Sequence, residues 1–593
     1  MDKTKKYLFL FALVFFTLNL TAQKRHYNKK NYISIIVPEE NPTETYYSKY
    51  RLAGNTLPGS RVTVNGKKYK VYPSGAFAGL LNLKIGVNKI IIKSTYKSNR
   101  TIGKKITIIR KDNKLKTTTS SNLVIEDTLM LPNEDLWLNN DDILKVRLKG
   151  TPGCKVTFMN GLTMTEISSE ETGGVKGIYT GIYKVKPEDR FLDKSITFKM
   201  EKNGREIKKY SKAKVSIIPS MLPRVGVITS ERSYLNYGLG TNRLGGAKLS
   251  FLEKGIKLTI DGMKGKQYRV RLTNNMIAWI PKEQVELLPF GTLPPKSLTD
   301  SWAVYGGKKY DKIIINLNEK LPYSTRQEIN PTRIIVDIYG ATSNTNWITQ
   351  HISAKEIKNL YYKQVGKDLF RIIIEPTHKQ IWGYNISYKN KALQIRVKKQ
   401  PRKLRISNLT FILDAGHGGN NRGALGSTGL LEKNVTLDIV KRLAKQLKKK
   451  GAKVILTRNR DIESKSIERL EKIKKLDGDI LISIHANSIG LTSDPIKTKG
   501  TATFYKHLCY RPLSLAIYKR MLSLKLEPFG NVGSFNFILN SPTEIPNVLV
   551  ETAFISNPSD EMKLMSGKFK NKIAKQIVKG VEDFLVKCKN NFN

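Results

Sequence analysis

The feature that most constrains the fold of this chain is a change in hydrophobic period near residue 405. Ahead of it, apolar and polar residues alternate in short runs separated by Gly, Pro and Asn, which is typical of half-buried β-strands. After it, strand-like runs such as "LTFILDAG" alternate with helical repeats, the first formed by Val435, Ile439, Leu443 and Leu447. Strands that alternate with helices predict a mostly parallel sheet covered by helices on both faces. We therefore expect a multidomain protein, with N-terminal all-β modules followed by a C-terminal α/β domain.

Length and turn residues divide the chain further. The 593 residues predict roughly four domains of about 150 residues. The stretches "LAGNTLPGSRVTVNG" (Leu52–Gly66) and "LKGTPGCKVTFMNG" (Leu148–Gly161) predict two copies of one module, in which Pro-Gly marks a turn and Asn-Gly a two-residue hairpin. The predicted units are a signal peptide (1–22), two modules resembling immunoglobulin-like sandwiches (31–112 and 122–218), one resembling an SH3-like barrel (222–290), a further β-rich module (300–399), a short basic linker (398–403) and the α/β domain (405–593).

The first residues predict a targeting signal. Lys3, Lys5 and Lys6 precede the apolar run Tyr7–Leu20, and Ala22 then offers a small residue for cleavage. This run is shorter than the ~20 residues of a spanning helix, no other segment is apolar enough, and no Cys follows the signal. An uncleaved anchor and a lipoprotein are therefore disfavoured. We expect export to the periplasm or cell surface of a bacterium, without stable membrane insertion after signal removal.

Charge and cysteine content limit which binding partners and which disulfides are expected. Lys and Arg number 103 against 49 Asp and Glu, a formal charge of +54, which attracts polyanions. Export argues against nucleic acid and leaves anionic envelope polymers open, although a solvated basic surface explains the dispersed lysines more simply. Cys154, Cys509 and Cys588 are odd in number and lack zinc-site spacing. We expect buried single cysteines, and a Cys509–Cys588 bridge stays open.

Four side chains of the C-terminal region fall where α/β sheets bind ligands, beyond the carboxyl ends of the strands. His417 follows "FILDAG", His485 ends "ILISI", Glu551 ends "NVLV", and Glu432 opens the first helix. Two His and one Glu around zinc, with a fourth position left open, form a catalytic set, and a second Glu supplies the proton-transfer group. Each residue alone has a plainer explanation, such as helix capping or a structural hydrogen bond. No compact HExxH spacing is present.

Five segments in order resemble the motifs of the zinc-dependent N-acetylmuramoyl-L-alanine amidases of type 3, over Leu409 to about Leu585: "ILDAGHGGNNRGALGSTGLLEKNVTLDIVKRLAKQL", "VILTRNRD", "DILISIHANS", "KGTATFY" and "IPNVLVETAFISNPSDEMKL". The resemblance implies Zn²⁺ held by His417, Glu432 and His485, with Glu551 as the catalytic carboxylate. It implies hydrolysis, in peptidoglycan, of the amide between the lactyl group of N-acetylmuramic acid and L-alanine of the stem peptide. Glu551 would take a proton from the attacking water and give one to the departing alanine nitrogen. Residues 300–399 resemble the β-rich wall-targeting module in front of many such amidases.

The same resemblance assigns lesser roles and leaves alternatives. Asp414, Asn487 and Arg469 match motif positions and are expected to support the site, and His507 to pack rather than bind metal. Only "KHLCYR" separates the "GTATFY" strand from the next helix, which leaves no room for the blocking helix of partner-activated members. We predict an open site or one restrained by the β modules. The stretch "EPFGNVGSFNFIL" lacks the charged turn of many relatives, which leaves the substrate contacts there undefined.

Two other functions stay open. A zinc peptidase acting on stem peptides would use the same metal chemistry on another bond. A non-catalytic wall-binding protein is disfavoured, because all four site residues are present.

Overall fold

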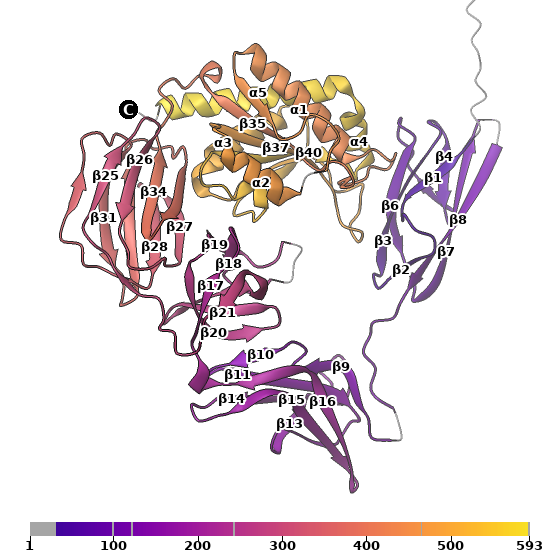
Figure 1. Cartoon of the computed structure of the whole chain (residues 1–593). Helices are drawn as coiled ribbons and strands as arrows, with labels where there is room; N and C mark the ends of the chain where they lie inside the picture. The colour runs from indigo at the N-terminus through magenta and orange to yellow at the C-terminus, as the bar shows by residue number, and fades with distance from the viewer. Residues whose placement is uncertain (1–30, 98–99, 120–121, 241–243, 464, 591–593) are drawn as a thin grey trace, which may run out of the picture.

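The computed structural model describes residues 31–97, 100–119, 122–240, 244–463 and 465–590. The predicted signal peptide lies outside these residues. The β modules follow one another around a curve, and the first of them lies beside the C-terminal domain (Figure 1). Within the described residues, no helix combines the length and the hydropathy needed to cross a membrane.

The first module consists of two sheets around one core. Strands β1, β3 and β6 form one sheet, and β2, β8, β7, β4 and β5 form the other. Leu52, Phe77, Ile92 and Ile108 are fully buried between them. The strands are β1 (Ile33–Val37), β2 (Thr43–Thr45), β3 (Lys49–Thr56), β4 (Arg61–Val64), β5 (Lys67–Tyr69), β6 (Ala76–Asn82), β7 (Gly86–Tyr96) and β8 (Arg100–Arg110).

The second and third modules share a continuous hydrogen-bonded sheet. Strand β10 pairs in parallel with β16 of the second module and antiparallel with β20 of the third. The second module contains β9 (Ile125–Leu131), β10 (Leu136–Leu138), β11 (Ile143–Gly150), β12 (Lys155–Phe158), β13 (Leu162–Glu166), β14 (Ile178–Lys184), β15 (Phe191–Lys202) and β16 (Arg205–Ile217). After η1 (Pro219–Met221), the third contains β17 (Arg224–Ile228), β18 (Ser233–Asn236), β19 (Lys248–Leu252), β20 (Lys257–Lys264), β21 (Gln267–Thr273), β22 (Met276–Pro281), η2 (Lys282–Gln284) and β23 (Val285–Leu287).

The two copies of the predicted repeat differ at the hairpin. In the first, Val64 pairs with Lys67 and only Asn65 and Gly66 form the turn, both with positive φ. In the second, Phe158 pairs with Leu162, so three residues form the turn. The prediction of a two-residue turn is therefore wrong for the second copy. There Met159 takes a positive φ of 50° and joins the turn.

The fourth module packs two main sheets against each other. Their orders are β30-β25-β26-β34-β33 and β27-β28-β32-β31. Its strands are β24 (Ser297–Leu298), β25 (Trp302–Gly306), β26 (Tyr310–Ile315), β27 (Tyr323–Ile329), β28 (Thr332–Tyr339), β29 (Ala341–Thr342), β30 (Ile348–Gln350), β31 (Ile357–Gln364), β32 (Leu369–Pro376), β33 (Tyr384–Lys389) and β34 (Ala392–Lys398).

The segment predicted as a basic linker is anchored at its start. Lys398 ends β34, is buried, and pairs with Asp479 of the C-terminal domain at 3.2 Å. Lys399 pairs with Asp311 at 3.1 Å. These two lysines therefore tie the fourth module to itself and to the next domain, because each meets a buried or partly buried carboxylate.

The C-terminal domain is a six-stranded sheet of order β36-β35-β37-β40-β38-β39, parallel except that β38 pairs antiparallel with β40. Helices α1, α3 and α5 pack on one face, and α2 packs on the other against Ile412 and Leu481 (Figure 1). The elements are η3 (Ile406–Asn408), β35 (Thr410–Ala415), α1 (Glu432–Lys449), β36 (Lys453–Leu456), α2 (Ser466–Lys475), β37 (Ile480–Asn487), β38 (Thr501–Phe504), η4 (Leu508–Tyr510), α3 (Arg511–Leu522), β39 (Pro528–Val532), η5 (Ile538–Asn540), β40 (Asn547–Phe554), α4 (Pro558–Met565) and α5 (Gly567–Asn590).

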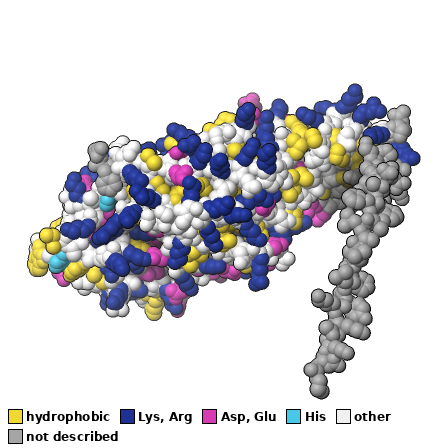
Figure 2. Space-filling model, turned by 90° about the horizontal axis from the view of Figure 1, so that it is seen from above, with side chains coloured by type: hydrophobic (Ala, Val, Ile, Leu, Met, Phe, Trp, Pro, Cys, Tyr) yellow, Lys and Arg dark blue, Asp and Glu magenta, His cyan; other side chains and the backbone are white. Residues whose placement is uncertain are grey.

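The surface charge is dispersed and the cysteines are unpaired, as the sequence predicts. Lys and Arg side chains are scattered over the face in Figure 2, with Asp and Glu among them. Cys154, Cys509 and Cys588 are free thiols, and the last two are buried. The Cys509–Cys588 bridge is therefore not formed in this structure.

Candidate metal centre

The candidate site lies at the carboxyl edge of the parallel strands of the C-terminal domain. His417 lies two residues beyond β35, and Glu432 is the first residue of α1. His485 and Glu551 lie within β37 and β40, near their ends, and are paired residues of the two parallel strands. Because side chains of paired residues in adjacent strands point to the same face, Glu551 lies beside His485 at the separation of neighbouring strands, about 4.8 Å. All four predicted residues thus share one edge.

His417, Glu432 and His485 form a compact cluster. One ligand atom from each lies within 4.8 Å of the other two. Glu432 Oε2 is 3.1 Å from His417 Nε2, and its Oε1 is 3.1 Å from His485 Nδ1. The Glu432 and His485 side chains are 5% and 8% exposed, whereas that of His417 is 24% exposed. The cluster is therefore open to solvent on the His417 side.

Glycine is required at two positions around the cluster. A Cβ on Gly416 would lie 2.5 Å from His485 Cε1. A Cβ on Gly423, whose φ is +69°, would lie 2.6 Å from Glu432 Oε2 and 2.7 Å from His417 Cδ2. All three distances are shorter than real Cβ contacts, so only glycine lets the backbone approach the three side chains this closely.

Electrostatics keep Glu432 ionised. Burial raises the pKa of its carboxyl, but the hydrogen bonds and charges of His417 and His485 outweigh burial and hold this pKa well below its usual range. Burial lowers the pKa of His417, and the hydrogen bond to Glu432 reverses this, so that its net shift is upward. Backbone N–H groups of Ala424 and Ala486 also donate to Glu432, at 2.8 and 3.0 Å. A negative carboxylate between two imidazoles is the form that binds a cation.

The donor set of the cluster fits a metal ion. His485 Nδ1 faces Glu432 Oε1 at 3.1 Å, whereas its Nε2 is buried and makes no hydrogen bond within the described part of the chain. Ligand atoms from His417, Glu432 and His485 lie within 4.8 Å of one another. His417 Nδ1 donates to Asn421 Oδ1 at 2.9 Å, so that in the neutral, metal-binding form of the ring Nε2 carries the lone pair and is directed at Glu432. Two imidazoles and one carboxylate are a donor set that zinc accepts.

The C-terminal domain matches a family of known proteins. A family model described as N-acetylmuramoyl-L-alanine amidase matches residues 411–583, and an AMIN domain model matches 303–407. N-acetylmuramoyl-L-alanine amidase AmiA of Escherichia coli is 31% identical over 215 residues, which cover 29% of this chain and 74% of AmiA. The chain belongs to this amidase family.

Two further members of the amidase family match over different lengths. N-acetylmuramoyl-L-alanine amidase AmiC of Neisseria meningitidis is 25% identical over 368 residues, 48% of this chain and 88% of AmiC. N-acetylmuramoyl-L-alanine amidase LytC of Bacillus subtilis is 33% identical over 215 residues, 35% of this chain. The match spans only 41% of LytC. The match to AmiC therefore spans more of this chain than the match to LytC.

Two buried arginines of this family member hold the loop that carries His417. Arg469 donates to the carbonyls of Ala415 and His417 and pairs with Asp414 at 3.4 Å. Arg458 donates to the Ala415 carbonyl at 3.0 Å and to the Gly416 carbonyl at 2.9 Å. Asp414 is fully buried and accepts from Thr457 and Ser483. The supporting role expected of Asp414 and Arg469 agrees with these contacts.

Sequence reasoning missed Arg458 and Asn421 as supporting residues. Asn421 lies in "LDAGHGGNN", the motif of His417, and Arg458 lies in the next motif, "VILTRNRD". Membership of these motifs was the available signal. Asn487 accepts from the backbone N–H of Ser488 at 2.8 Å, which shapes the loop after β37. His507 lies outside the cluster and donates from Nε2 to the Ser541 carbonyl at 2.9 Å, which agrees with the packing role expected for it.

The connection between β38 and α3 is short. Only residues 505–507 and the single turn η4 (Leu508–Tyr510) lie between these elements. The expected absence of a blocking helix at this point is therefore confirmed for the described residues.

Proposed function

We propose that this protein is a peptidoglycan amidase that hydrolyses the amide between the lactyl group of N-acetylmuramic acid and L-alanine of the stem peptide. The observation that carries the proposal is the His417–Glu432–His485 cluster with Glu551 paired beside it, in a domain that matches the amidase family. The names of the relatives AmiA, AmiC and LytC support the same bond.

The metal of the proposed site is Zn²⁺, held by His417, Glu432 and His485. When bound, zinc supplies a Lewis acid that polarises the scissile carbonyl and acidifies water. Glu551 takes a proton from the water whose oxygen bonds to the lactyl carbon. As the C–N bond breaks, Glu551 returns a proton to the alanine nitrogen, so the products are a lactyl carboxylate and a free amine. Asn421 and the two loop arginines keep His417 in place during these steps.

The β modules belong to the same proposal. Export to the periplasm or cell surface places the protein at its substrate, and the AMIN match over 303–407 supports a wall-targeting role for the fourth module. The two sheets of the first module support an immunoglobulin-like sandwich, and its sequence repeat extends the same assignment to the second module. The third module is assigned as an SH3-like barrel. Anionic envelope polymers are a further ligand class for the basic surface, whose formal charge is +54.

The test is digestion of purified sacculi by the zinc-loaded protein, followed by mass spectrometry of the released fragments. We expect free peptides that begin with L-alanine. Glu551→Gln should lower the rate about 10²- to 10⁴-fold, the usual contribution of a positioned acid–base group. Glu527→Gln is the matched control, because Glu527 is exposed and pairs only with Lys499 among the described residues, at 3.3 Å.

Two results would contradict the proposal. Fragments cut within the stem peptide would identify the alternative zinc peptidase. Unchanged hydrolysis by Glu551→Gln would remove Glu551 from the mechanism.

A further inference from the structure

A cavity of about 530 Å³ lies where the first β module meets the C-terminal domain. On the C-terminal side it is lined by residues 422–425, which lead to Glu432, and by Ser488 and Leu491, which follow the strand of His485. The Ala424 N–H in this lining donates to Glu432 Oε2 at 2.8 Å. The cavity therefore adjoins the candidate metal centre. Its opposite lining belongs to the first module: Val37, Pro38, Glu39, Glu40, Thr43, Tyr50 and Arg51.

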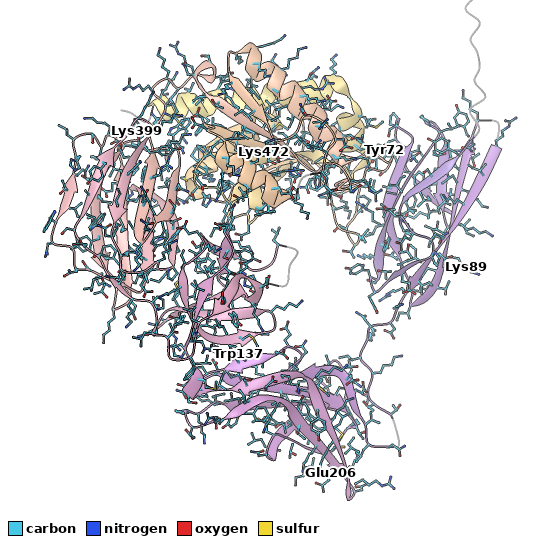
Figure 3. All side chains as sticks on the ribbon, in the orientation of Figure 1. Tyr72, Lys89, Trp137, Glu206, Lys399 and Lys472 are labelled. Atoms are coloured by element: carbon cyan, nitrogen blue, oxygen red, sulfur yellow. The ribbon has the colours of Figure 1, made fainter. Side chains whose placement is uncertain are left out.

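The first module is held against this cavity by hydrogen bonds over a long sequence distance. The Arg51 backbone N–H donates to the Leu491 carbonyl at 2.7 Å, and Asn55 Nδ2 to the Ser427 carbonyl at 3.3 Å. At the rim, Arg422 pairs with Glu39 at 3.2 Å. Tyr72, labelled in Figure 3, lies at the border of the module and the C-terminal domain and is 8% exposed. The module thus forms a fixed wall of the cavity.

Arg51 is the unusual residue of that wall. It is only 7% exposed, yet it pairs with no carboxylate among the described residues. Its Nη1 makes one long hydrogen bond, 3.4 Å to the Ile489 carbonyl, and its buried Nε makes none within the described residues. A guanidinium carries five N–H donors and keeps its charge, so a buried one without an anion is costly. Burial accordingly lowers its pKa, against a small opposite contribution from Tyr50.

We propose that Arg51 binds a carboxylate of the substrate peptide, so that the first β module supplies a subsite of the metal centre from outside the C-terminal domain. This inference rests on the proposed amidase function. The ligand is a peptide carboxylate, because the stem peptide that extends from the scissile amide carries carboxylates on its acidic side chains and at its end. A carboxylate also matches the paired donors of a guanidinium. Glu39 already pairs with Arg422 at the rim of the cavity, and Arg51 pairs with no carboxylate among the described residues.

The test measures binding without turnover, in protein that carries Glu551→Gln and excess Zn²⁺. The probes are N-acetylmuramoyl-L-alanyl-D-glutamate and the same compound with its carboxylates amidated, titrated by calorimetry. We expect the free acid to bind about 10- to 100-fold more tightly than the amide, the range for a buried hydrogen bond to a charged group. Adding Arg51→Met should weaken binding of the free acid to the level of the amide and leave binding of the amide unchanged.

Two controls separate recognition from docking of the module. Asn55→Ala removes the hydrogen bond to Ser427 without touching Arg51, and should keep the preference for the acid. If Arg51→Met weakens acid and amide equally, the residue only holds the module in place and the proposal is wrong. If that variant does not fold, the protein that retains Arg51 still tests the proposal, because equal binding of the acid and the amide by this protein overturns it. Equal binding of acid and amide by protein that retains Arg51, with peptide release intact, refutes this inference alone, whereas absence of peptide release refutes the proposed function.

Discussion

The glycine at position 423 offers the sharpest test of how the metal centre is built. With φ at +69°, alanine there costs about 1–2 kcal/mol in backbone strain. Its Cβ would also lie 2.6 Å from Glu432 Oε2, well inside an ordinary contact of roughly 3.4 Å, so the carboxylate must move by nearly 1 Å. Disturbing the groups that hold a metal ligand in place typically lowers the affinity for the metal about 10- to 100-fold. We expect Gly423→Ala to weaken zinc binding by that factor, or about 1.4–2.8 kcal/mol.

Gly429→Ala is the matched control for this variant. Gly429 lies in the same loop with φ at +88°, so its backbone strain is similar, but its Cβ would meet only Ile36 Cδ1, at 3.7 Å. Zinc affinity is measured by competition with a chromophoric chelator, and thermal unfolding shows that both variants fold. The reasoning fails if Gly423→Ala binds zinc as tightly as the unmodified protein, or if both variants lose the same affinity.

The remaining predictions concern pH and metal removal. Burial, with the charge of Lys506, lowers the pKa of His507 to about 3, against 6.5 in the unfolded chain. The stability that neutral His507 provides is therefore complete above pH 6.5 and is lost as the pH falls toward 3, by about 1.4 kcal/mol per pH unit. Urea unfolding at pH 7 and 5.5 should show a smaller loss for His507→Gln, and equal losses would contradict this. Zinc at 100 times its dissociation constant should stabilise the protein by about 2.7 kcal/mol, reversibly by chelation. Glu432→Gln should remove this gain in thermal unfolding, whereas Glu463→Gln, an exposed residue bonded to Asn420, should keep it.

Much of the C-terminal domain could be predicted because its elements carry a clear period. Strand β35 lies within the predicted strand "LTFILDAG", and helix α1 buries the predicted repeat Val435, Ile439, Leu443 and Leu447. Strand β39 and helix α4 were not predicted: "PFGNV" starts with Pro and does not alternate, and α4 has only eight residues. Strand β39 is placed by tertiary packing, whereas the signal for α4 is its cap, in which Asn557 accepts from the backbone N–H groups of Ser559 and Asp560 and Pro558 follows it, and not a hydrophobic period.

The site divides in the same way. The strand ends indicated His417, His485 and Glu551, the start of a helix indicated Glu432, and the resemblance to the amidase family assigned their roles, which stay predictions. The contribution of Arg51 could not be predicted, since it is 438 residues away in sequence from the Ile489 carbonyl that it contacts. Nothing in an alternating β pattern indicates which distant surface a module will meet.

The shared sheet of the second and third modules affects how firmly the first module stays in place. Because β10 bonds to both β16 and β20, these two modules form one continuous unit, to which the first module is joined by the chain between β8 and β9. A connection of this kind gives an effective concentration on the order of millimolar at a nearby surface. An interface with an intrinsic dissociation constant of about 0.1 mM would then be closed in roughly nine molecules of ten. For an interface of that strength, the hydrogen bonds at Arg51 and Asn55 keep the cavity wall assembled in the intact chain, whereas the same module supplied as a separate chain at micromolar concentration dissociates.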